Sequence, residues 1–343
     1  MEDKMKVKNF LELFNLSLPE LGKMADEIRK KKCGELVTFV VDTNINYTNI
    51  CASKCAFCAF YAREGGYVLS TDEIIEKISY AVDRGVTQVM LQGGMNPELG
   101  VEWFESLFKK IKSKFPDIHL HSLSPPEIVF LSEMERCSIA EILDRFRKAG
   151  LDSLPGGGAE ILVDRIRKRI SPRKCSADEW IEVMRTAHKL GMKTTATMMF
   201  GHVEDKKDII EHLLRIRDLQ NETEGFTAFI PWTYQPGNNK LSCEISEPAP
   251  FTHYLRVLAI SRVVLDNIRN IQASWLTQGF DVSVLSLFFG ANDFGGVMLE
   301  ERVLKSTGKD VTSPGIKNII KAIKSTGRPV AQRDTYYRIL RRF

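Results

Sequence analysis

The sequence lacks any apolar run long enough to be inserted into a bilayer. A membrane-spanning helix needs about 20 mostly apolar residues, and no apolar run in this chain of 343 residues reaches that length. The N-terminal segment also lacks the uninterrupted apolar core of a secretory signal, and its charge pattern is that of one or two amphipathic helices. We therefore expect a cytoplasmic protein with no membrane partner.

A strong charge of one sign is missing too. Lys and Arg number 48 against 44 Asp and Glu, which leaves a net charge of +4 spread along the chain. Nucleic-acid surfaces gather positive charge in stripes or patches, so we expect no nucleic-acid partner. A content of 43% hydrophobic and 27% charged residues is typical of a globular protein with a sizeable core. No Pro- or Ser-rich linker divides the chain, and its turn-rich stretches at 155–158 and 235–240 are short enough to be loops.

The seven cysteines are an odd number and have no export signal beside them. Cytosolic thiols are kept reduced, so ligation or catalysis is favoured over a disulfide framework. Four of them are scattered, without a partner at ligand spacing, and are expected to be packing residues: Cys33, Cys137, Cys175 and Cys243.

From residue 36 onward, short β-branched runs alternate with segments of helical period, as in βα units around a parallel sheet. Expected strands are 35–48, 86–94, 117–124, 151–158, 192–201, 225–232, 270–275 and 291–296. Expected helices are 70–85, 101–115, 139–150, 176–191, 207–220, 251–267 and 282–289. These units predict an α/β fold, a (β/α)8 barrel over residues 36–343 that includes C-terminal helices, behind an N-terminal helical cap at 1–35. The chemistry of such barrels lies on the loops that follow the strands.

One such loop carries the strongest motif, YTNICASKCAFCAFY. Cys51, Cys55 and Cys58 form a C-x3-C-x2-C pattern directly after the first strand, so three thiolates can converge on one metal centre. An iron–sulfur cube held by three cysteines keeps one iron free of protein ligands, whereas structural zinc normally takes four ligands. Zinc completed by a distant residue, or three buried thiols without a ligand, are the alternatives.

This cysteine spacing, with the aromatic Phe57 before the last cysteine, resembles the radical SAM superfamily. The resemblance implies a [4Fe-4S] cluster whose open iron binds S-adenosylmethionine (SAM), and an external one-electron reductant such as flavodoxin or ferredoxin. It also implies SAM contacts at residues that match the family's motifs: Phe57, Gly93, Gly94, Glu160, Gly201 and Glu204. Many members have Glu after the glycine pair, where this chain has Met95, so only the backbone role of the pair is carried over.

A closer resemblance is to the radical SAM enzymes that cyclise dehypoxanthine futalosine on the futalosine route to menaquinone. It is carried by CAFCAFYAREGGYVLS, SLPGGGAEILVDRIRKRISP, TATMMFGHVE, FIPWTYQPGNNKL, QASWLTQG and GANDFGGVMLEE. The first segment is shared with aminofutalosine synthase and the deazaflavin-forming subunits, which remain alternatives; an iron–sulfur electron carrier is a remote one. The oligomeric state is left open.

The cyclase chemistry implies a 5′-deoxyadenosyl radical that takes hydrogen from ribose C4′, ring closure on the benzoate, and a base for the last proton. His121 has a pKa range suited to a base, with Asp293 and Glu127 as alternatives. Glu127 is also a candidate for substrate binding, with the aromatics Trp232, Tyr234 and Trp275, which could stack on the substrate. Packing, capping and ordinary hydrogen bonding explain any of these residues equally well.

Overall fold

A closed ring of parallel strands forms the centre of the computed structural model, which describes residues 2–309 and 312–343. The strands are β1 (Val37–Val40), β2 (Asp42–Ile45), β3 (Gln88–Leu91), β4 (His119–Leu120), β5 (Ser153–Leu154), β6 (Lys193–Phe200), β7 (Phe226–Thr233), β8 (Asn270–Ile271) and β9 (Asp293–Gly296). The series β2 to β4 and the series β5 to β8 pair in chain order, and β9 pairs with β1. Single parallel bridges, His121 to Ser153 and Gln272 to Asp293, join these sheets into the ring.

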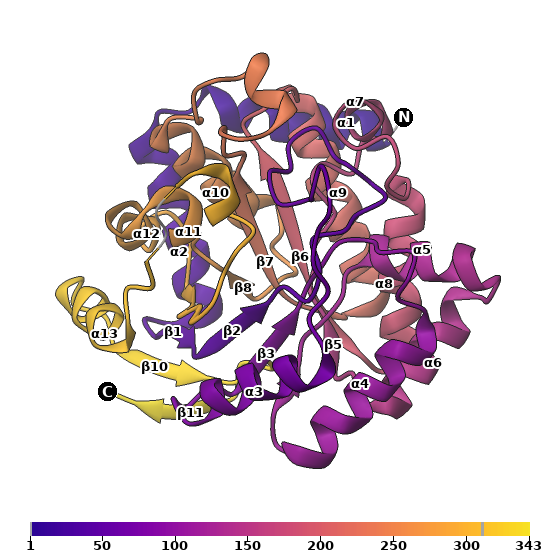
Figure 1. Cartoon of the computed structure of the whole chain (residues 1–343). Coiled ribbons are helices and arrows are strands. Elements are labelled where there is room, and N and C mark those ends of the chain that lie inside the picture. The colour runs from indigo at the N-terminus through magenta and orange to yellow at the C-terminus, as the bar shows by residue number, and fades with distance from the viewer. Residues whose placement is uncertain (1, 310–311) are drawn as a thin grey trace.

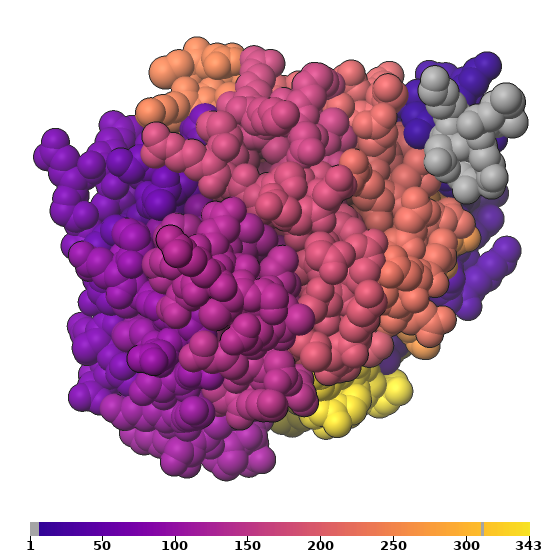
Figure 2. Space-filling model, turned by 90° about the vertical axis from the view of Figure 1, so that its right-hand side faces the viewer, coloured from indigo at the N-terminus to yellow at the C-terminus, as the bar shows by residue number. Residues whose placement is uncertain are grey.

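Helices cover the outside of this ring (Figure 1). They are α3 (Thr71–Val82), α4 (Val101–Lys114), α5 (Pro125–Glu135), α6 (Ile139–Ala149), α7 (Asp164–Ile170), α8 (Ala177–Lys189), α9 (Lys206–Thr223), α10 (Phe251–Val264), α11 (Trp275–Gln278) and α12 (Phe280–Ser286), with short 3-10 turns η2 (Lys240–Cys243) and η3 (Lys305–Thr307). Neighbours pack in chain order, α4 on α6, α6 on α8, α8 on α9 and α9 on α10, and Figure 2 shows successive segments side by side across one face. With β1 and β2 counted as one strand interrupted at Val41, the predicted (β/α)8 barrel is confirmed.

The predicted helix signals act as expected where they occur. The Ser70 hydroxyl accepts the Glu73 N–H while the Glu73 carboxylate accepts the Ser70 N–H, which is the capping box that starts α3. Gly150 ends α6 in the left-handed conformation, with φ of 115°. None of the helices in the described part of the chain is both long and apolar enough to cross a membrane.

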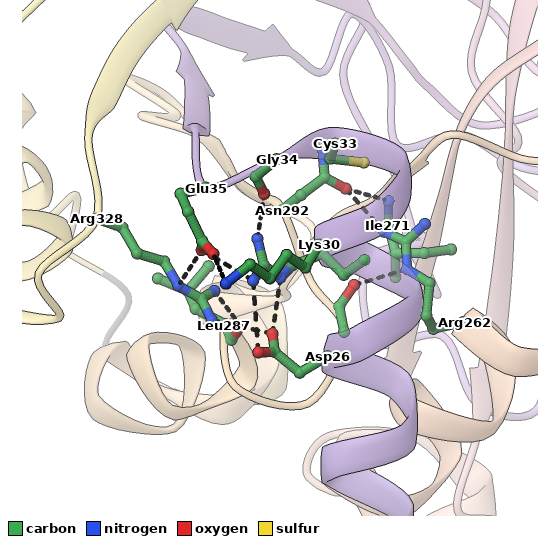
Figure 3. A network of polar contacts seen from close by, with 12 residues as sticks. Asp26, Lys30, Cys33, Gly34, Glu35, Arg262, Ile271, Leu287, Asn292 and Arg328 are labelled. Carbon is green, nitrogen blue, oxygen red and sulfur yellow. Dashed lines mark hydrogen bonds and ion pairs between the residues drawn. The ribbon is translucent and has the colours of Figure 1, made fainter.

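The N-terminal segment is helical, as predicted, with α1 (Glu2–Leu11), η1 (Glu12–Asn15) and α2 (Leu18–Cys33). Met1 lies outside the described residues, as do 310 and 311 of the barrel segment. The second half of α2 and the residues after it meet the barrel through charged side chains, and Figure 3 shows Asp26 and Glu35 facing Arg328. Arg328 Nη2 is 2.9 Å from Asp26 Oδ1, and on α10 Arg262 Nη2 donates to Asn292 Oδ1 at 2.8 Å. These contacts, the Asp26 network, lie at the end of the barrel where β1 begins, so they leave the opposite end free for ligands.

The C-terminal segment differs from the expected helices. It contains α13 (Ile316–Ser325), followed by a hairpin of β10 (Val330–Arg333) and β11 (Ile339–Arg342), with β10 parallel to β1. The run VAQR has no alternation of apolar and polar residues, so its extended form depends on pairing with β1, which local sequence does not reveal. This hairpin brings Arg333 into the interior of the barrel, where it lines the central cavity.

Candidate active site

The loop between β2 and α3, residues 46–70 and called the Cys loop below, lies at the carboxyl end of the strands. It carries the free thiols of Cys51, Cys55 and Cys58. Backbone hydrogen bonds fix the loop to three neighbouring segments: Ala52 N–H donates to Met95 O (2.9 Å), Ala56 N–H to Ile170 O (2.8 Å), and Leu241 N–H to Ala56 O (2.9 Å). The thiols are therefore held in place by loops from both halves of the barrel.

The three thiols are close enough to interact electrostatically. Burial raises the pKa of Cys55 to about 11 and also raises the pKa of Cys58, and the neighbouring thiol adds to the shift in each case. Within residues 2–309 and 312–343, no three His, Cys, Asp or Glu side chains converge on a position for a single metal ion. An iron–sulfur cube makes no such demand, because each cysteine binds a different iron.

The glycine pair after β3 supports this loop. A Cβ at Gly94 would lie 2.1 Å from the Ile50 carbonyl oxygen and 2.8 Å from Cys51 Cβ, and one at Gly93 would lie 2.6 Å from the Tyr47 ring. The Gly94 N–H donates to Thr48 O at 2.9 Å, while neither carbonyl of the pair accepts a hydrogen bond from a described residue. A carbonyl is the backbone group that can accept from an amino group, so the geometry fits the predicted contact with SAM.

Glu160 lies beside the cysteines, although not in the cavity lining. Its Oε1 is 2.5 Å from Lys174 Nζ, and Lys174 lies over the Phe57 ring at 5.2 Å. Burial opposes ionisation of Glu160, but the charges of Lys174 and Arg167, together with hydrogen bonds, outweigh it, so the pKa of Glu160 is lowered. A cluster with three thiolates carries negative charge, and Lys174, whose charge also acts on Cys55, is a partly buried cation suited to balance it. Sequence analysis missed Lys174, since a lysine in a polar loop carries no local signal.

Gly201 and Glu204 form a self-contained turn after β6. Glu204 Oε1 accepts the Gly201 N–H at 2.6 Å, and Oε2 accepts the His202 N–H at 2.9 Å. Gly201 adopts φ of 81°, which favours glycine. Burial would raise the pKa of Glu204, but hydrogen bonds and the His202 ring lower it overall. Neither residue lines the central cavity, so their contact with SAM stays a prediction.

A cavity of about 340 Å³ occupies the barrel interior and opens beside the Cys loop. That volume is in the range of small-molecule sites. Six of the predicted site residues line it: Phe57, Cys58, His121, Trp232, Tyr234 and Trp275. Trp275 donates from Nε1 to Gly296 O at 2.8 Å, and the Tyr234 hydroxyl donates to Asn239 Oδ1 at 2.7 Å, so both rings are fixed by their polar ends.

His121 faces the cavity in its neutral form. Burial lowers its pKa well below the usual value, and the neighbouring His119 and Arg333 act in the same direction. Nδ1 is 2.6 Å from Ser153 Oγ, and Nε2 is 3.4 Å from Thr195 Oγ1. A histidine with a depressed pKa is a weak proton acceptor.

Asp293 and Glu127 lie outside the cavity lining. Arg333 binds Asp293 through two hydrogen bonds of 2.6 and 2.9 Å, and Thr38 Oγ1 donates to Oδ2 at 2.5 Å. Glu127 accepts from the Tyr47 hydroxyl at 2.6 Å and from Ser124 Oγ at 2.5 Å, and burial raises its pKa to about 7. The structure thus gives both carboxyl groups protein partners in place of a ligand.

Two polar residues that sequence analysis passed over do face the cavity. Asp42 and Asn44 follow Val40 at alternate positions of β1 and β2, so all three side chains point the same way, and all three line the cavity. Their signal was available in the run VVDTNINYT, where polar residues recur with period two inside a strand. Period two alone does not show which face of a strand lies toward a cavity.

Two family models match this chain. The one described as the Radical SAM superfamily covers residues 45–216, and the one described as the CofH/MqnC C-terminal region covers residues 223–342. The chain belongs to the radical SAM superfamily. It is therefore a radical SAM enzyme, whose cofactors are a [4Fe-4S] cluster and SAM. The thiols of the Cys loop, the partly buried Lys174 beside them and the tight glycine pair fit that cluster.

Individual relatives resemble the chain over nearly its whole length. The cyclic dehypoxanthine futalosine synthase of Streptomyces coelicolor is 44% identical over 93% of this chain and 81% of its own, and that of Halalkalibacterium halodurans is 42% identical over 100% and 92%. The 5-amino-6-(D-ribitylamino)uracil–L-tyrosine 4-hydroxyphenyl transferase of Methanococcoides burtonii is 40% identical over 96% and 94%. Among solved structures, methylornithine synthase has a TM-score of 0.74 at 19% identity, over 94% of this chain and 93% of its own, which supports the barrel fold alone.

Proposed function

We propose that this radical SAM enzyme cyclises dehypoxanthine futalosine in menaquinone biosynthesis. The observation that supports this proposal most is that residues from both matched regions line the same cavity. The first supplies the Cys loop, with Phe57 and Cys58 at the cavity. The second, described as the CofH/MqnC C-terminal region, supplies the aromatic wall of Trp232, Tyr234 and Trp275. Relatives 44% and 42% identical that are named for this product support the choice of substrate.

Each part of the site has a role in this proposal. Cys51, Cys55 and Cys58 hold the [4Fe-4S] cluster, and the Gly93 and Gly94 carbonyls accept from the amino group of SAM. When bound and reduced, the cluster would supply the electron that cleaves SAM, and the adenosyl radical so formed would take the C4′ hydrogen of the substrate ribose. Trp232 and Trp275 stack against the benzoate and exclude water from the part of the cavity that holds this ring. Phe57, Glu160 and Glu204 complete the SAM pocket.

The test is product analysis under anaerobic conditions with a reductant such as flavodoxin or dithionite. With SAM and dehypoxanthine futalosine, the proposal predicts free 5′-deoxyadenosine and a product lighter than the substrate by two hydrogens. An adenosyl adduct with another substrate would instead indicate aminofutalosine synthase. Transfer of 4-hydroxyphenyl from tyrosine to 5-amino-6-(D-ribitylamino)uracil would indicate the activity for which the archaeal relatives are named.

The ligand assignment has its own test. Cys55→Ala should abolish both the iron–sulfur absorbance and SAM cleavage, because one iron loses its thiolate. Cys243→Ala is the matched control, since Cys243 is exposed and distant in sequence from the motif. Full cluster occupancy in the Cys55 variant would contradict the assignment.

A further inference from the structure

Among the described residues that line the cavity are two carboxyl groups, Asp42 and Glu301, and one imidazole, His121. Cyclisation by the proposed function leaves a ring carbon that still carries its hydrogen after C4′ has bonded to it. Rearomatisation requires a group within reach of that proton. The hydrogen bonds of the three groups decide which of them is available.

Glu301 is occupied by the backbone. Its Oε1 accepts the Val303 and Leu304 N–H groups at 2.7 and 3.1 Å, and its Oε2 accepts the Leu304 N–H at 3.0 Å. It therefore caps the chain ahead of η3. His121 keeps both ring nitrogens near hydroxyl groups and has a depressed pKa, so it binds a proton weakly.

Asp42 has one occupied oxygen and one free oxygen. Its Oδ1 accepts the Met298 N–H at 2.8 Å, whereas Oδ2 accepts no hydrogen bond from another described residue. A Cβ at Gly296 would lie 2.1 Å from Oδ2 and 2.3 Å from Oδ1, so the carboxyl group has its present position only because residue 296 is glycine. Asp42 is 3% exposed and lines the cavity.

A second free acceptor lies next to it on the same face of the strand. Asn44 Oδ1 is buried and has no hydrogen-bond partner, while Asn44 Nδ2 donates to Gln92 Oε1 at 3.2 Å. An unpaired buried acceptor costs about 1–3 kcal/mol, and a hydroxyl-bearing ligand in the cavity would satisfy it. Two unpaired acceptors side by side therefore indicate where the polar part of a substrate lies.

We propose that Asp42 Oδ2 is the base that takes the last proton of the cyclisation, an inference that rests on the proposed function. The C–H bond at the attacked ring carbon breaks, its proton passes to Oδ2, and its electron pair stays in the ring. The remaining unpaired electron passes to a one-electron acceptor of the iron–sulfur or flavin class, which restores a closed-shell aromatic product.

The charges around Asp42 suit this role. Burial raises the pKa of Asp42 to about 6, Asp293 on β9 adds to the shift, and Arg333 on β10 opposes it. Arg333 remains bound to Asp293 and forms no ion pair with Asp42. A base whose pKa lies near the working pH is ionised in the resting enzyme and still binds a proton well.

The experiment compares wild type, Asp42→Asn, Gly296→Ala and His121→Asn, with Asp72→Asn on the exposed start of α3 as the matched control. Each is given SAM and dehypoxanthine futalosine deuterated at C4′, under anaerobic reducing conditions. Deuterium in 5′-deoxyadenosine counts hydrogen abstraction, and the cyclic product counts completed turnovers. The Asn variant should keep deuterium transfer while product per 5′-deoxyadenosine falls about 100-fold, and an organic radical should accumulate in electron paramagnetic resonance spectra.

Gly296→Ala displaces the carboxyl group and should reproduce this fall, which also decides the matter if Asp42→Asn does not fold. In wild type, the amount of cyclic product per 5′-deoxyadenosine should rise as the pH passes about 6, because Asp42 is then ionised. Three results would each overturn the inference while the proposed function stands. Asp42→Asn could keep the wild-type amount of cyclic product per 5′-deoxyadenosine, or raise KM without changing that amount. The third is a fall in product per 5′-deoxyadenosine in His121→Asn instead. A wild type that forms no product lighter by two hydrogens would overturn the proposed function itself.

Discussion

Replacing Asp293 with Ala tests whether this buried carboxylate is structural. The substitution removes two hydrogen bonds from Arg333, which is 4% exposed, and one from Thr38. Breaking a buried ion pair by removing one partner costs about 3–5 kcal/mol, because the other charge is left uncompensated. An unfolding entropy of about 2.1 cal/mol/K per residue gives roughly 0.7 kcal/mol/K for this chain, so the Tm should fall by about 4–7 °C.

The assay is anaerobic thermal unfolding of the cluster-loaded enzyme. Asp144→Ala is the control, since its pairs with Arg147 and Lys148 are on the surface and should be worth less than about 1 kcal/mol. The double variant Asp293→Leu, Arg333→Met removes both charges and should recover most of the loss. A single variant that unfolds within 1 °C of wild type, at about the precision of the assay, would refute the reasoning, and a loss of product alone would return Asp293 to the list of possible bases.

Three further predictions concern the loop, the base and the N-terminal cap. Gly94→Ala should lose most of its iron after reconstitution because its Cβ would overlap the backbone of the Cys loop, whereas Gly157→Ala, with contacts no closer than 3.4 Å, should keep it. In urea unfolding, Asp42→Asn should be more stable than wild type by up to about 3 kcal/mol at pH 8 and equal to it below about pH 4. The raised pKa of Asp42 means that the native state binds more protons than the unfolded state. The wild type therefore loses stability as the pH rises through about 6. Arg328→Met should lower the free energy of unfolding by about 1–3 kcal/mol through the Asp26 network, and an equal loss in the exposed Arg169→Met would contradict that origin.

The Cys loop could be predicted from sequence because its evidence is local. Three cysteines within eight positions stand on one loop whatever the rest of the chain does, and Ser70 with Glu73 marks a helix start on its own. The helix α5 was missed, because no element was expected between the strand 117–124 and the helix 139–150. It begins with Pro125 and Pro126, and proline is favoured in a first helical turn. That helix turns Glu127 toward Tyr47 and away from the cavity, so its role could not be judged from its place after a strand.

Asp42 and Asp293 are both buried aspartates on neighbouring strands, so their sequence positions do not distinguish their roles. Their hydrogen bonds do. Asp293 is met by Arg333, Thr38 and the Gly295 N–H, which is the satisfaction expected of a buried charge with a structural role. Asp42 receives a single backbone N–H from another residue. A sequence selected for stability alone would pair that oxygen or replace the residue, so an open acceptor held beside a cavity by Gly296 is better explained by a ligand than by the fold. An oxygen without a hydrogen-bond partner also marks Asn44 as a ligand contact, whereas Glu301 and Glu127 have partners for their carboxylates. The position of these residues in the sequence could not separate them.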